Sequence, residues 1–120
     1  MRRQEELQAI IVSLRTTLPT LKGVLIASID GLAIAQSLAI GDPNRIAAMA
    51  ATALGLGKRV IETIDAGGLS DLTIGGTNGQ MFVYSAGASA VLVIIANEKP
   101  NVGLINLEAR EAAKKIAALT

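Results

Sequence analysis

The feature that most constrains this sequence is a helical segment without charge. Residues Ile46 to Gly57 contain only apolar and small side chains and one threonine, a composition that favours a helix of about three turns. A helix that is apolar around its whole circumference has to be covered on every side. A chain of 120 residues can cover one side of such a helix with a sheet. The sequence therefore predicts that another molecule covers the rest.

Glycine inside this helix points in the same direction. Gly55 and Gly57 each cost about 0.5 to 1 kcal/mol relative to Ala in a helix, so we expect them to permit close contact with another helix. Closed two-fold dimers are the commonest oligomers, and a second copy is the expected partner. The predicted contact residues on the helix are Ile46, Met49, Ala50, Ala53, Leu54, Gly57, Val60 and Ile61. The alternative is that the Ala-rich segment is simply a good helix former within its own domain.

Hydrophobic periodicity and turn residues predict the remaining elements. A first amphipathic helix runs from Glu5 to Leu18, where Pro19 follows. A hairpin of two strands, Val24–Ile29 and Leu32–Ser37, follows around Asp30-Gly31, for which we expect a two-residue type I′ turn. Asp42 as N-cap and Pro43 at the first position open the uncharged helix, which we expect to reach about Ile64.

The second half of the chain reads as a meander followed by a helix. Three short strands are expected at Leu69–Ile74, Gln80–Ser85 and Ala90–Ala96, separated by glycine-containing turns. A last helix begins after Asn101, a good N-cap, and should pair Glu111 with Lys115. The predicted class is α/β in the α+β sense, with the order α-β-β-α-β-β-β-α. We expect residues 1–120 to form a single domain.

Composition excludes most catalytic chemistry. The sequence has no His and no Cys, so a Ser-His-Asp triad, a thiolate nucleophile and the usual zinc ligands are all absent. Gly55-Leu56-Gly57-Lys58-Arg59 lacks the first Gly and the final Ser or Thr of a phosphate loop, and it lies within the predicted helix. We therefore expect a protein that is not an enzyme, with no catalytic, cofactor-binding or metal-binding residues.

Charge does not identify a partner. The net charge is +1, from 11 basic and 10 acidic residues spread along the chain, which predicts no nucleic-acid binding. The uncharged stretch from Gln80 to Asn97 is interrupted by polar and glycine residues, so we expect a buried hairpin and no membrane insertion. The absence of cysteine and of an export signal near the first residues favours a cytoplasmic protein.

Three segments in this order resemble the Roadblock/dynein light chain family, which includes bacterial gliding-type regulators. They are the hairpin Val24–Ala35, the Ala-rich helix Ile46–Ile64 and the opening of the last helix, Asn101–Arg110. The resemblance implies a five-stranded antiparallel sheet sandwiched between the central helix and the two terminal helices. It also implies homodimers in which the central helices pack together and the third strand pairs with its symmetry mate. The strand residues expected at that contact are Ser70, Asp71, Leu72, Thr73 and Ile74.

The resemblance also suggests a function. Members of this family are expected to regulate small Ras-like GTPases, and so we predict a non-enzymatic homodimeric scaffold that binds such a GTPase. The sequence assigns no arginine finger: Arg45, Arg59 and Arg110 are candidates only by their charge. The alternative hypothesis is a small-molecule sensor domain of similar architecture, which would require a pocket that the small side chains and scarce aromatics do not favour.

Overall fold

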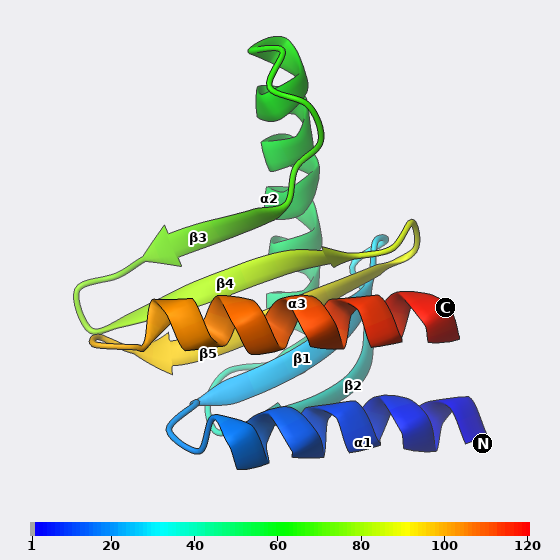
Figure 1. Ribbon diagram of the computed structural model, residues 1–120, viewed down its shortest axis with the longest axis vertical. Coiled ribbons are helices and arrows are strands. Elements are labelled where there is room, and N and C mark those ends of the chain that lie inside the picture. Colours follow the sequence, from blue (N-terminus) through cyan, green and yellow to red (C-terminus); the bar gives the residue numbers. More distant parts are fainter. Residues whose placement is uncertain (1) are drawn as a thin grey trace.

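A computed structural model describes residues 2–120 and confirms the predicted order of elements (Figure 1). The elements are α1 Arg2–Thr17, β1 Gly23–Ser28, β2 Ala33–Leu38, α2 Pro43–Thr63, β3 Asp71–Gly75, β4 Gly79–Ala86, β5 Ala90–Asn97 and α3 Val102–Leu119.

The five strands form one antiparallel sheet in the order β2-β1-β5-β4-β3. Helices α1 and α3 cover one face, and α2 crosses the other (Figure 1). The predicted sandwich is therefore confirmed. β5 lies at the centre between β1 and β4, and β2 and β3 form the two edges. β1 and β5 are almost fully buried.

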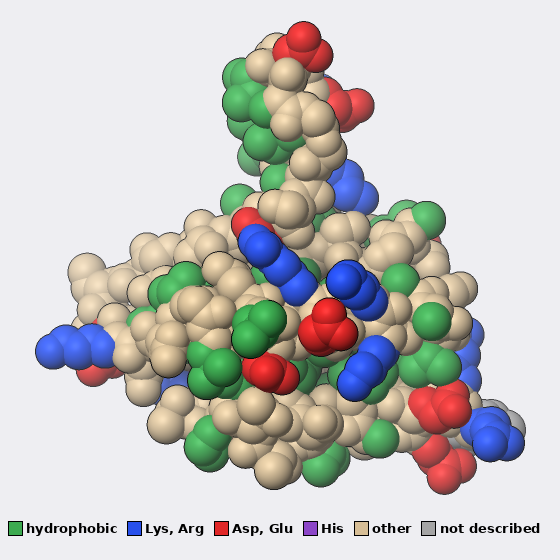
Figure 2. Space-filling view, in the orientation of Figure 1, with side chains coloured by type: hydrophobic (Ala, Val, Ile, Leu, Met, Phe, Trp, Pro, Cys, Tyr) green, Lys and Arg blue, Asp and Glu red, His purple; other side chains and the backbone are tan. Residues whose placement is uncertain are grey.

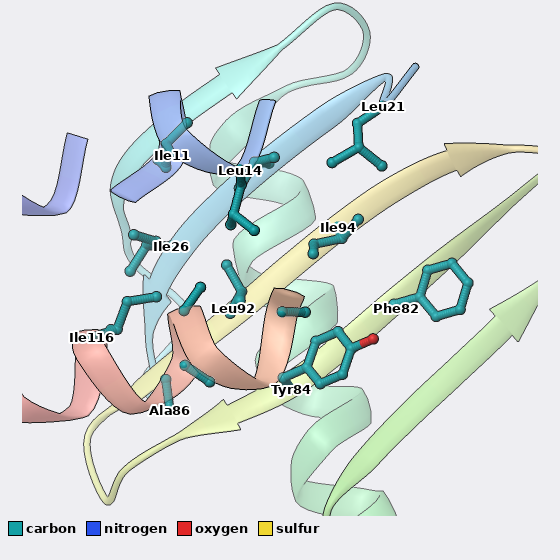
Figure 3. Close-up of a cluster of buried hydrophobic side chains, with 14 of the residues drawn as sticks. Ile11, Leu14, Leu21, Ile26, Phe82, Tyr84, Ala86, Leu92, Ile94 and Ile116 are labelled. Atoms are coloured by element: carbon teal, nitrogen blue, oxygen red, sulfur yellow. The ribbon is translucent and has the colours of Figure 1, made fainter. Parts of the chain in front are cut away.

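Each face of the sheet has its own aliphatic core. On the face of the terminal helices, Tyr84 and Phe82 lie among isoleucine and leucine side chains of both helices and of the central strands (Figure 3). On the opposite face, Ala47, Ala50 and Leu54 of α2 pack against side chains of β1, β4 and β5. The alternation of strand residues between the two faces explains why neighbouring residues of β4 enter different cores.

Both predicted N-caps are confirmed. The Asp42 carboxylate accepts a hydrogen bond of 3.0 Å from the backbone N–H of Asn44, and Pro43 occupies the first turn of α2. The Asn101 side chain accepts one of 3.1 Å from the N–H of Leu104 at the start of α3. These bonds satisfy N–H groups that have no partner within the helix itself.

The predicted type I′ turn is wrong. That turn needs positive φ at both central residues, whereas in this loop only Gly31 has it, at 89°. The Gly31 N–H donates to the Ser28 carbonyl over 3.0 Å, and the Ser28 N–H donates to the Leu32 carbonyl over 2.9 Å. This is a type I turn followed by a glycine in the left-handed region. A Cβ at Gly31 would lie 3.1 Å from Cα of Ala48, so α2 also leaves no room for a side chain there.

Two further details differ from the prediction. β3 begins at Asp71, two residues later than predicted. Leu69 packs on α2 instead of joining the strand. Its Cδ2 atom is so close to Gly57 that a Cβ added there would lie 3.1 Å from it. Glu111 pairs with Lys114 over 3.5 Å, three residues away, in place of the expected Lys115.

Candidate interaction surface on α2 and β3

The second half of α2 extends beyond the edge of the sheet (Figure 1). Of its residues only Ala47, Ala50 and Leu54 are buried, so the chain itself covers one side of the helix. Leu56 and Ile64 keep 62% and 64% of their surface exposed. The sequence argument that this domain cannot cover the uncharged helix is thus consistent with the structure.

The exposed apolar side chains of α2 form one flank, which we call the α2 flank. Its members follow three- and four-residue steps and are Met49, Ala53, Leu56, Val60 and Ile64. Polar residues, among them Thr52, Arg59 and Thr63, lie on the remaining exposed side. Figure 2 shows the hydrophobic side chains gathered on one side of the projecting end of the helix. An apolar stripe on a helix surface normally packs against another element.

An open apolar groove lies between the α2 flank and β3. Its volume is about 420 Å³. The residues that line it come from α2, from the segment before β3 and from β3 itself: Ala53, Leu56, Gly57, Val60, Ile61, Leu69, Asp71, Leu72 and Ile74. The predicted helix contact and the predicted strand contact therefore border the same groove.

β3 presents a free backbone edge beside this groove. The Gly76 N–H donates to the Gly79 carbonyl over 2.7 Å, which marks a hydrogen-bonded pair at the end of the β3–β4 ladder. Bonding alternates along an antiparallel strand, so Leu72 and Ile74 bond to β4, whereas the backbone groups of Thr73 point away from the sheet. Such an edge can accept a strand from another chain.

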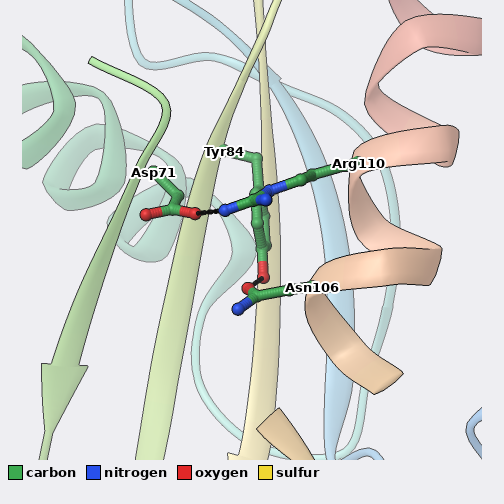
Figure 4. Close-up of polar contacts among 4 residues, drawn as sticks. All are labelled: Asp71, Tyr84, Asn106 and Arg110. Atoms are coloured by element: carbon green, nitrogen blue, oxygen red, sulfur yellow. Dashed lines mark hydrogen bonds and ion pairs between the residues drawn. The ribbon is translucent and has the colours of Figure 1, made fainter. Parts of the chain in front are cut away.

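Asp71 ties β3 to the helix layer behind the sheet. Its carboxylate lies 2.6 Å from the Arg110 guanidinium, which raises the pKa of Arg110 (Figure 4). Beside this pair the Tyr84 hydroxyl donates to the Asn106 side-chain oxygen over 2.6 Å. Burial raises the pKa of Tyr84 to about 12; the Asp71 carboxylate raises it as well, and Arg110 lowers it. These two contacts link β3 and β4 to α3.

The structure divides the predicted contact residues into two sets. Ala50 and Leu54 are buried under the sheet of their own chain and offer no surface to a partner, so we remove them from the predicted contact. Ile46 packs against the same core. The residues left on the groove, along the α2 flank or on the β3 edge are Met49, Ala53, Gly57, Val60, Ile61, Asp71, Leu72, Thr73 and Ile74. Ser70 precedes β3 and lies beside Arg110 and Ala113 of α3.

Two residues of the groove, Leu56 and Leu69, were not assigned to the contact from the sequence. A third, Gly57, was assigned, but its place in the structure has a different reason from the one expected. Leu56 lies in the uncharged helix, so the periodicity that places Val60 on the flank also signals it. Leu69 lies outside the strand register, and no local signal marks it. Gly57 faces the Leu69 side chain, whereas Gly55 has no heavy atom within 4 Å of an added Cβ and lies among polar residues.

Within residues 2–120 no three His, Cys, Asp or Glu side chains come together as a metal site would require. Among the helices described, none combines the length and the hydropathy needed to cross a bilayer.

The fold and the groove define a small α/β module with an apolar surface, and comparison with known proteins identifies its family. The family model of the Roadblock/LC7 domain matches residues 7–96. The chain belongs to the Roadblock/LC7 family. Two uncharacterized proteins of Methanocaldococcus jannaschii, MJ1340 and MJ0714, are each 35% identical to it over 100 and 99 residues. Each of these alignments covers 82% of this chain, and they cover 87% and 83% of the two relatives.

Several solved structures have the same fold. A structure described as MglB with tetrameric arrangement superimposes with a TM-score of 0.89, covering 98% of this chain and 89% of that one, at 16% identity. The gliding protein MglB of Thermus thermophilus gives a TM-score of 0.85 at 16% identity, with 98% and 90% coverage. A Roadblock/LC7 domain from Streptomyces avermitilis gives 0.84 at 18% identity, with 92% and 94% coverage.

Proposed function

We propose that this protein is a non-enzymatic regulatory scaffold that forms a homodimer and binds a small Ras-like GTPase. The observation that carries the dimer is the apolar groove between the α2 flank and β3, which runs beside a free strand edge. A second copy related by a two-fold axis would bring the same helix flank and the same strand edge to this place. The two elements that need covering would then cover each other.

Charge on the groove agrees with a self-complementary contact. The groove side chains are apolar except for Asp71, and that carboxylate is already neutralised by Arg110 of its own chain. Bringing two copies together would therefore bury no unpaired carboxylate from this position. A strongly charged partner would find no complementary charges there.

Family membership supports the GTPase half of the proposal. The resemblance seen in the sequence links this family to regulation of small GTPases, and two of the similar structures are named MglB, one of them a gliding protein. The absence of His and Cys from the sequence agrees with a protein that acts by binding. The proposed location, where such a GTPase would be met, is the cytoplasm.

Sedimentation velocity tests the dimer. We expect the unmodified chain to sediment as a dimer at micromolar concentration. Ala53→Glu places a carboxylate in the groove and should give monomers, because burying an unpaired charge is strongly unfavourable. Thr52→Glu is the matched control, since Thr52 is exposed on the polar side of the same helix turn, and it should remain dimeric. A folded monomer over the whole concentration range would refute the dimer.

Affinity capture tests the partner. The immobilised dimer is incubated with native lysate containing either GDP or a non-hydrolysable GTP analogue, and bound proteins are identified by mass spectrometry. We expect one small GTPase to be enriched in one nucleotide state, and the purified GTPase to bind in a direct titration. If no GTPase is retained in either state, the GTPase half of the proposal fails and the dimer is tested separately as above.

A further inference from the structure

The two edges of the sheet differ in how their backbone groups are used. At the β2 edge, the Ala39 N–H donates to the Lys22 carbonyl over 3.1 Å, and Gly23 pairs with Leu38. By the alternation of an antiparallel ladder, the backbone groups of Gln36 and Leu38 then point away from β1. β2 would therefore be as open to another strand as β3 if nothing covered it.

Side chains of the same chain cover these outward groups. Gln4 of α1 donates to the Ile34 carbonyl over 2.7 Å, and Gln8 donates to the Gln36 carbonyl over 3.4 Å. The Gln36 side-chain oxygen accepts from the N–H of Leu38 over 3.1 Å. Two carbonyls and one N–H of this edge are thus already bonded within the chain, including one of the two outward groups of Gln36 and one of the two of Leu38.

The spacing of the two α1 residues fits the spacing of the strand. Gln4 and Gln8 are one helical turn apart, a rise of about 6 Å. Ile34 and Gln36 are two residues apart in a strand, a distance of about 7 Å. A helix running along the strand can therefore bond alternate carbonyls with side chains from one of its faces.

β3 has no such cover. Over the part of the chain that the structure describes, no side chain bonds to the outward backbone groups of Asp71, Thr73 or Gly75. The side-chain bond of Asp71 to Arg110 lies on the helix side and leaves the edge open. The molecule therefore has one edge that is partly capped by its own side chains, β2, and one that is not, β3.

We infer that Gln4, Gln8 and Gln36 determine how far chains assemble, by closing the β2 edge so that sheets join only through β3. This inference rests on the proposed pairing through β3. With both edges open, a two-fold contact at β3 and another at β2 would alternate without end and give a fibre. With β2 closed, assembly through the sheet stops at two chains.

The test removes the three caps and compares assembly by sedimentation velocity across a concentration series. The triple variant Gln4→Ala, Gln8→Ala, Gln36→Ala should form species larger than the parent, and their size should grow with concentration. Alanine is a better helix former than glutamine, so α1 should remain folded. Ser13→Ala is the control, because Ser13 lies on the side of α1 that faces α3, and it should behave as the parent.

A second arm separates this inference from the proposed dimer. Thr73→Pro removes an N–H that points away from the sheet, so it blocks pairing at β3 and leaves the β3–β4 ladder intact. The single variant Thr73→Pro should be monomeric. If it is still a dimer, the proposed pairing through β3 is wrong. Added to the triple variant, it should give pairs joined through β2, which tests the caps whether or not β3 pairs.

Hydrogen exchange makes a negative result decisive. In the triple variant the Leu38 amide loses its acceptor, so its exchange rate should rise if no strand replaces the caps. If that amide exchanges faster while the sedimentation profile stays that of the parent at every concentration, the inference is overturned. Gln8→Lys, which keeps a donor of similar reach, should retain the assembly state of the parent.

Discussion

Tyr84 is the only tyrosine of the chain, and its buried hydroxyl is bonded to Asn106. Its pKa is raised to about 12, above the ordinary value of 10.0, so the folded protein holds its proton at a pH where the unfolded chain has lost it. The unfolded state then binds fewer protons, and stability falls as pH rises. The stabilisation is complete below about pH 10 and is lost as the pH approaches about 12.

Denaturant unfolding across this alkaline range gives the measurement. We expect the free energy of unfolding to fall between about pH 10 and 12, and the fall to be smaller in Tyr84→Phe. At neutral pH the same variant should be less stable by about 1 kcal/mol, because the Asn106 oxygen loses its donor. Absorbance of tyrosinate follows this one residue directly. A midpoint near the ordinary value in the folded protein would contradict the assignment.

Two glycines should respond to alanine in opposite directions. Gly31 has φ of 89°, and its Cβ would meet backbone atoms of Ala48, so Gly31→Ala should destabilise the fold by more than about 1 kcal/mol. Gly55 lies in α2 with open space around it, so Gly55→Ala should stabilise by about 0.5 to 1 kcal/mol. Thermal unfolding measures the melting temperature of each variant relative to the parent protein. Equal shifts of the same sign would contradict it.

Residue-level prediction succeeded where the signal is local. Asp42 and Asn101 accept hydrogen bonds from backbone N–H groups two and three residues further along the chain, so the local sequence is enough to identify them as caps. Ala50 and Leu54 could not be separated from Ala53 by the same means. In a helix without charge no polar face marks the solvent side, and the direction toward the sheet is fixed only by tertiary packing.

At the scale of elements, β3 is the least enclosed strand and is held from behind by one ion pair. Arg110 and Asp71 are partly exposed, so Arg110→Ala should lower the free energy of unfolding only slightly. The local effect should be larger: amide exchange in β3 should quicken while exchange in β1 and β5 stays unchanged. A double-mutant cycle with Asp71→Asn measures the coupling, and a coupling of zero would show that the pair does not hold β3.

The order and type of all eight elements could be predicted because each carries a periodicity or turn signal of its own. The β1–β2 loop was the exception, since its geometry depends on contact with Ala48, which is distant in sequence. The groove itself could be predicted only in part. Its helix side follows from periodicity, but the place of Leu69 beside Gly57 arises from how α2 crosses the sheet.

For the molecule as a whole, the proposed pairing links stability to concentration. A chain whose folded form associates is stabilised by mass action, so its melting temperature should rise with total protein concentration. The same series with Ala53→Glu should show a constant melting temperature. Scanning calorimetry of the two proteins makes the comparison, and a melting temperature of the parent that does not depend on concentration would contradict pairing.

The overhanging end of α2 has a further consequence during synthesis in a cell. In the proposed pairing a new chain would carry this end uncovered until it meets another, and residues 62–68, at the end of the helix and just after it, are exposed throughout. Exposed connecting segments rich in small residues are the preferred places of cleavage. Under the proposed pairing, the unpaired chain is the form that proteases would remove, and surplus copies would be cleared while pairs persist.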